Sequence, residues 1–219
     1  MLSPPPLNQL AHDISILIIY FILGASIKYI DQAFDIRVFN KKTATIIAIP
    51  TGLLMGLTVM VDSPSASIFI AMALGLAVAR KIDNIAFRIG IVLVVLLPIF
   101  FVNLMNLLWL PFSALFIASL VDEYGNDWSD KHYKKAIMKK HKTLDKRKEL
   151  TAFLMRYRSA MKVTIIVLVV TKQLAFIYLP AFLLFDLGYT LVERISFDLI
   201  PYSIKDPHFK KEDNPLLYT

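Results

Sequence analysis

The sequence contains no cysteine. It therefore has no disulfide framework, no thiolate nucleophile and no cysteine-ligated metal, although this absence does not identify a redox compartment. Glycine is also scarce, with seven among 219 residues. We find no phosphate-binding glycine loop, dinucleotide fingerprint, G-x-S-x-G or H-E-x-x-H motif. The sequence gives no support for a hydrolase built on a Ser, His and Asp triad.

Charged residues are few as well, at 19% against 57% hydrophobic residues, and the mean hydropathy is +0.60. These values favour a polytopic membrane protein over a soluble domain. The net charge of +7 would suggest nucleic acid as the partner of a soluble protein. Here the basic residues lie between apolar runs, as in loops that are retained in the cytoplasm. We therefore expect no nucleic-acid partner.

The first hydrophobic run is not preceded by a basic region, since the chain begins "MLSPPPLNQLAHD". A cleaved signal peptide normally begins with basic residues. We expect the first helix to remain in the protein.

Apolar runs of roughly 17 to 22 residues are long enough to cross a bilayer as helices. We predict an all-α integral membrane bundle of about seven short transmembrane helices, at residues 14–31, 43–61, 65–82, 86–103, 106–121, 162–179 and 180–195. The last segment contains Asp186 and Glu193, so a re-entrant last hairpin would reduce the count to six or five. Tight connections that contain Pro, Asn or Ser suggest an internal repeat of helical hairpins.

The basic residues collect on one side of this bundle. The positive-inside rule assigns that side to the cytoplasm, which predicts a multi-pass protein of the cell membrane with its N-terminus outside and its C-terminus inside. The predicted parts are transmembrane helices in 1–127, a basic cytoplasmic arm in 128–161, a transmembrane hairpin in 162–198 and a polar cytoplasmic tail in 199–219.

Segment 128–162, which is the arm with the next residue, contains twelve Lys or Arg residues after position 130, with Ile, Leu, Met and Phe interleaved. This composition is typical of an amphipathic helix, and we expect segment 128–162 to contact the anionic headgroups of membrane lipids. The alternative interpretation is a solvated extension whose charges only set the topology.

Four predicted helix ends on the cytoplasmic side carry an acid directly after a β-branched residue, and these acids are Asp31, Asp83, Asp122 and Glu193. An anion at a helix C-terminus opposes the helix dipole, and Lys or Arg is usual there. The recurrence indicates a repeated architecture or a shared chemical need, and repeats often place a site between their units.

The acidic helix ends predict a divalent-cation site that faces the cytoplasm. Asp31 and Asp35 are four residues apart and share one helix face, and "DEYGND" adds further carboxylates. Hard oxygen donors suit Mg²⁺ or Mn²⁺. The candidate metal ligands are Asp31, Asp35, Asp83, Asp122, Glu123 and Asp127, and the candidate phosphate contacts are Lys28, Lys81 and Arg88. The alternative is that these acids and bases pair with one another and only fix the helix packing.

A second charge pair is predicted within the membrane. Lys172 and Asp186 lie seven residues before and after Leu179, so a hairpin that turns at Leu179 and Pro180 brings them to the same depth. A charge alone there costs at least ~2.5 kcal/mol, which favours an ion pair. The pair would act as an internal clasp or belong to an ion pathway.

Three functions are compatible with these patterns. The first is a metal-dependent enzyme that acts on a phosphorylated or diphosphate lipid. The arrangement resembles membrane-bound prenyltransferases and CDP-alcohol phosphotransferases, which hold diphosphate through Mg²⁺. Their Asp-rich motifs are longer and more regular than "IDQAFD" and "VDEYGND", so no residue is carried over. The other two are a cation channel or transporter, and a non-catalytic membrane subunit or scaffold. The sequence leaves the oligomeric state open.

Overall fold

A computed structural model of the protein describes residues 7–82, 84–101, 107–138 and 159–199. These residues form seven helices and no strand, which confirms the predicted all-α class for this part of the chain. The helices are α1 (Leu7–Asp35), α2 (Lys41–Val61), α3 (Ser63–Val78), α4 (Ile85–Phe101), α5 (Trp109–Met138), α7 (Ser159–Val170) and α8 (Tyr178–Leu199).

Two segments in the described residues are long and apolar enough to cross a membrane, Asn8–Asp35 in α1 and Lys41–Val61 in α2. Three other apolar helices are shorter, Ser63–Val78, Ile85–Leu97 and Ser159–Val170. Length and composition are the basis of this assignment, and a buried helix of a soluble protein meets the same criteria. The two helices thus give limited support for membrane association and do not establish a multi-pass topology.

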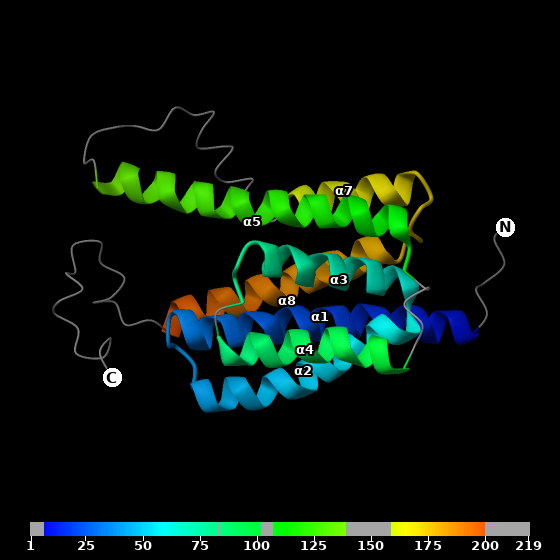
Figure 1. Ribbon diagram of the computed structural model, residues 1–219, viewed down its shortest axis with the longest axis horizontal. Helices are drawn as coiled ribbons and strands as arrows, with labels where there is room; N and C mark the ends of the chain where they lie inside the picture. Colours follow the sequence, from blue (N-terminus) through cyan, green and yellow to red (C-terminus); the bar gives the residue numbers. More distant parts are fainter. Residues whose placement is uncertain (1–6, 83, 102–106, 139–158, 200–219) are drawn as a thin grey trace.

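The helices lie side by side along one axis (Figure 1). Helices α1, α3, α5 and α8 run in one direction, and α2, α4 and α7 run in the other. One end of the bundle, the charged end, consists of residues 28–42, 79–82, 84–88, 122–128, 159–162 and 189–199. The opposite end, the far end, consists of residues 8–13, 61–65, 107–112 and 171–178.

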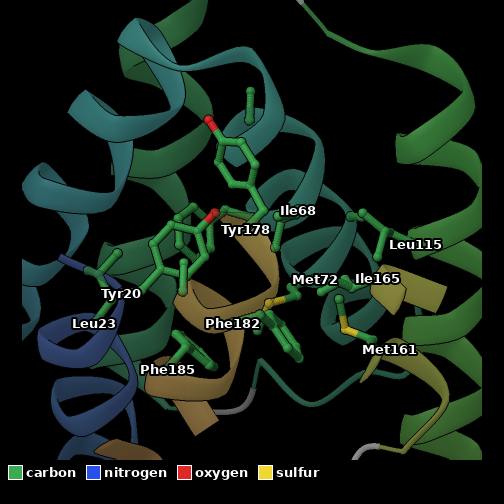
Figure 2. Packing of buried hydrophobic residues seen from close by; sticks show 14 of the residues in the cluster. Tyr20, Leu23, Ile68, Met72, Leu115, Met161, Ile165, Tyr178, Phe182 and Phe185 are labelled. Carbon is green, nitrogen blue, oxygen red and sulfur yellow. The ribbon is translucent and has the colours of Figure 1, made fainter. Parts of the chain in front are cut away.

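The larger of two apolar clusters in the described residues contains side chains of all seven helices, and Figure 2 shows its part between α1, α3, α5, α7 and α8. Its largest fully buried side chains are Tyr20, Phe69 and Phe185. The ring centroids of Tyr20 and Phe69 are 4.7 Å apart, and those of Phe69 and Phe185 are 6.2 Å apart. Tilted contacts of this kind contribute about 0.5–1.5 kcal/mol per pair. The cluster separates the polar groups of the charged end from those of the far end.

Glycine allows α1 and α8 to pack backbone against backbone. A Cβ atom on Gly24 would collide with the carbonyl group of Phe185, and one on Gly188 would collide with the carbonyl oxygen of Phe21. Small residues at such positions let helices approach closely in membranes. The pairs with the most extensive packing are α1 with α8, α2 with α4 and α3 with α5. None of these is a consecutive hairpin, and the internal hairpin repeat stays a prediction.

The helices α3 and α7 end in the same motif. Arg80 and Lys172 adopt left-handed backbone conformations, with φ of 56° and 58°. The N–H of Lys81 donates to the carbonyl of Leu76 over 3.0 Å, and the N–H of Gln173 donates to that of Leu168 over 2.8 Å. Glycine is usual at this position. A basic residue there instead places a positive charge at the negative end of the helix.

The connection between the last two helices differs from the prediction. Helix α7 ends at Val170 and α8 begins at Tyr178, so the turn consists of residues 171–177 instead of Leu179 and Pro180. Pro180 lies in the first turn of α8, where backbone N–H groups have no acceptor within the helix. The N–H group that proline lacks therefore costs no helical hydrogen bond.

Helix α5 continues to Met138, so the predicted basic arm begins as the end of this helix. Residues 139–158 of the arm and 200–219 of the tail lie outside the described residues, and these two predictions are not tested.

Candidate functional site

A polar cavity of about 420 Å³ lies at the charged end of the bundle. Its polar lining comes from α1, the turn after α3, α5 and α8, and consists of Lys28, Asp31, Asp35, Arg80, Lys81, Glu123, Asn126, Asp127 and Tyr189. Six of the nine residues that the sequence predicts as metal or phosphate contacts are in this lining. The fold thus brings together side chains that are distant in sequence.

Lys28 is buried on α1 and joins it to α8. Its Nζ is 2.9 Å from Asp31 Oδ2 and 3.3 Å from Glu193 Oε1. The ammonium group also donates to the hydroxyl of Tyr189 over 3.2 Å and lies 4.5 Å from the centre of that ring. Three groups on two helices therefore fix one positive charge at the wall of the cavity.

Lys81 has the same role between the turn after α3 and α5. Its Nζ is 2.8 Å from Glu123 Oε2 and 2.9 Å from Asp127 Oδ1, and it donates to the Glu123 carbonyl over 3.3 Å. Burial alone would lower the pKa of Lys81, but the hydrogen bonds to Glu123 and Asp127 outweigh it and raise the pKa above the ordinary value of 10.5. Lys81 is therefore charged throughout the neutral range.

These contacts give each lysine three partners within the protein. An ammonium group has three N–H donors, and Lys28 and Lys81 each contact three acceptors within the protein. In the described part of the chain, no group of three or more His, Cys, Asp or Glu residues is arranged to hold a metal ion. A cation in this cavity would need further ligands from another molecule.

Asp122 is buried and is not part of the cavity lining. Its two carboxylate oxygens accept hydrogen bonds from the backbone N–H groups of Ala160 and Met161, each over 2.9 Å. These groups belong to the first turn of α7, whose N–H donors have no partner within the helix. Asp122 therefore caps α7 from α5, a role that its position in the sequence does not indicate.

Two other predicted residues are also not in the lining. Asp83 lies outside the described residues, and Arg88 is exposed on α4. Three polar residues of the cavity were not predicted as site residues. Arg80 and Asn126 are close in sequence to predicted ones, whereas Tyr189 reaches the cavity only through the packing of α8 against α1.

The structure does not form the predicted pair of Lys172 and Asp186. Asp186 Oδ2 instead lies 2.7 Å from the Nζ of Lys162, which joins α8 to α7. Helix α7 ends at Val170, so Lys172 lies in the exposed connection between α7 and α8. Lys172 and Asp186 are equally far from Leu179 in sequence, but they do not lie at the same depth in the bundle.

No protein-family model, no curated protein and no solved structure matches this chain. The geometry of the site is therefore the basis for assigning a function.

A second buried polar network lies at the far end. Asp62 caps α3 by accepting from the N–H of Ser65 over 2.9 Å, and it accepts from the hydroxyl of Tyr178 over 2.6 Å. The Nε2 of His12 is 3.6 Å from Asp62 Oδ1. The sequence Asp62-Ser63-Pro64 is a typical helix start, and this signal could have identified the cap. The network ties α1, α3 and α8 together.

Proposed function

We propose that this chain is a multi-pass membrane protein that binds the phosphate or diphosphate headgroup of a lipid in the polar cavity, together with Mg²⁺ or Mn²⁺. The observation that carries this proposal is the convergence of Lys28, Lys81 and Arg80 with four carboxylates on one cavity. The positive-inside rule assigns this end of the bundle to the cytoplasm, with the N-terminus outside.

Large apolar side chains on the outer faces of the helices support the membrane assignment. Ile46 is 68% exposed, Leu57 is 52% exposed and Val167 is 52% exposed. Soluble proteins rarely expose extensive contiguous apolar surface. A bilayer around the described helices would cover these side chains.

The charges of the cavity favour the joint binding of a metal and a phosphate group. A metal ion alone would compete with Lys28 and Lys81 for their carboxylates, and a phosphate alone would compete with the carboxylates for the lysines. When both bind, the carboxylates can turn to the metal and the ammonium groups to the phosphate. Mg²⁺ in particular is usually held by one or two carboxylates plus substrate phosphates.

The candidate ligands on the cavity wall are Asp31 and Asp35 of α1 and Glu123 and Asp127 of α5. Asp83 remains a candidate from the sequence alone. A metal that bridges phosphate oxygens, with cations beside it, stabilises the charge that develops on a leaving phosphate. The proposed reaction class is therefore the transfer or cleavage of a phosphate ester or diphosphate of a lipid.

Two arginines that are close in sequence provide a matched test. Arg80 lines the cavity and Arg88 does not. The protein would be incorporated into nanodiscs of phosphatidylcholine, and binding of dioleoyl phosphatidic acid would be measured by native mass spectrometry with and without Mn²⁺. We expect Arg80→Gln to weaken binding about tenfold, because a hydrogen bond to a charged group contributes roughly 1.5–3 kcal/mol. Arg88→Gln should bind like the wild type.

The same samples test the coupling. Mn²⁺ should bind more tightly when phosphatidic acid is present, and phosphatidic acid should bind more tightly by the same factor when Mn²⁺ is present. Equal affinity of the wild type, Arg80→Gln and Arg88→Gln for the lipid, with no effect of Mn²⁺, would overturn the proposed function.

A further inference from the structure

A narrow apolar cleft of about 60 Å³ lies beside the polar cavity, between α1, α2, α3 and α4. The two spaces share four lining residues, Ile27, Leu76, Phe87 and Ile91. The two spaces therefore adjoin at these residues, with the polar one at the charged end and the apolar one towards the middle of the bundle. This is the shape that a molecule with a charged head and a hydrocarbon chain requires.

The cleft has almost no capacity for hydrogen bonding. Thr51 is the one residue of its lining with a polar side chain, and the Thr51 hydroxyl already donates to the carbonyl of Ile47 over 2.8 Å. Water in the cleft would find few partners, and a water molecule needs two to four of them. Hydrocarbon suits this lining.

Gly90 is part of the cleft lining on the α4 side. A Cβ atom added to Gly90 would meet no other atom within 4 Å. From Phe87 to Val94 the lining follows α4 for seven residues, or about 10 Å at ~1.5 Å per residue. The volume and length fit a stretch of chain, not a whole lipid.

We propose that this cleft binds part of the hydrocarbon chain of the lipid whose phosphorylated headgroup occupies the polar cavity. The inference rests on the proposed function, because it assigns the chain-binding part of the same site. It also defines the substrate class: a phosphorylated amphiphile with an apolar chain, and not a free phosphate or a water-soluble phosphate ester.

Photo-crosslinking of the full chain tests the inference. The protein would be reconstituted in phosphatidylcholine vesicles that contain phosphatidic acid with a diazirine in one acyl chain, and adducts would be located by peptide mass spectrometry. We expect adducts on Met55 and Val94, which line the cleft and are 8% and 2% exposed. Lipid that only surrounds the protein would label Leu57 and Leu96, which are 52% and 42% exposed.

The substitution Gly90→Leu extends a side chain from the cleft lining, and Val92→Leu enlarges an exposed position on the same helix. Labelling of Met55 and Val94 should fall several-fold in Gly90→Leu and stay unchanged in Val92→Leu. Gly90→Ala, whose Cβ meets no neighbour, should still fold and should show a smaller decrease. Adducts confined to Leu57 and Leu96 in the wild type would overturn the inference.

A diazirine phosphatidylcholine probe and the Arg80→Gln variant separate this inference from the proposed function. If phosphatidic acid binding depends on Arg80 but no lipid labels the cleft, the inference fails and the proposed function stands. If both probes label the cleft equally and Arg80→Gln changes nothing, the proposed function fails and the cleft binds the chain of any membrane lipid.

Discussion

At the scale of single residues, the bundle depends on carboxylates that satisfy the donors of other helices. Asp122 accepts two N–H groups at the start of α7, and Asp62 caps α3 while accepting from Tyr178 of α8. Each carboxylate therefore holds at least two helices.

Replacing Asp122 with alanine should destabilise the protein. The substitution leaves the N–H groups of Ala160 and Met161 without their acceptors, and the loss of a helix cap costs about 0.5–2 kcal/mol. Asp122→Asn keeps an acceptor oxygen and should lose less. The free energy of unfolding in mixed micelles, titrated with a denaturing detergent, measures the difference.

The control is Asp198→Ala, which removes an exposed carboxylate near the end of α8. It should change stability by no more than about 0.5 kcal/mol. If Asp122→Ala were as stable as Asp198→Ala, the cap would contribute nothing to stability.

At the scale of helices, close approach depends on glycine at defined positions. Gly188 of α8 faces the backbone of Phe21 on α1, so an added methyl group must push the two helices apart. Gly90 of α4 has open space in the same position. We therefore expect the substitution of alanine for glycine to have opposite effects on stability at these two positions.

We expect Gly188→Ala to destabilise the protein by about 1–3 kcal/mol, the usual cost of overpacking. Gly90→Ala should be neutral or stabilising by up to about 1 kcal/mol, because alanine favours the helix over glycine. Thermal unfolding in the same detergent compares the variants. Equal melting temperatures for Gly188→Ala and the wild type would show that α1 and α8 do not pack as described.

The sequence predicted the helices because apolar runs are a local signal. The predicted turn at Pro180 was wrong because proline is equally compatible with a turn and with the first turn of a helix. The end of α7 depends on a left-handed conformation at Lys172, which no glycine marks in the sequence. The sequence therefore contains no local signal for the connection at residues 171–177.

The candidate site was predictable to the extent that its residues are neighbours on one helix. Asp31 and Asp35 on α1, and Glu123 and Asp127 on α5, each share a helix face and reach the same cavity. The choice of partner for each acid depends on how separate helices pack. That is why the capping role of Asp122 and the contact of Lys28 with Tyr189 could not be predicted.

At the scale of the whole molecule, the proposed topology makes the two ends of the bundle differ in accessibility. Because the chain has no cysteine, single cysteines can be introduced without removing others. Trp109, 67% exposed at the far end, and Lys41, exposed at the charged end, are suitable positions. In intact cells, a membrane-impermeant maleimide should label Trp109→Cys and should label Lys41→Cys only after lysis. Equal labelling of both before lysis would contradict the topology.

The ion pairs of Lys28 and Lys81 have a consequence for the stability of the charged end. Since each ammonium group contacts two carboxylates within the protein, neither lysine is a buried charge without a partner. These two lysines therefore need no bound anion for their charges to be balanced within the fold. Occupancy would be governed by an exchange of partners among charges that are already in place.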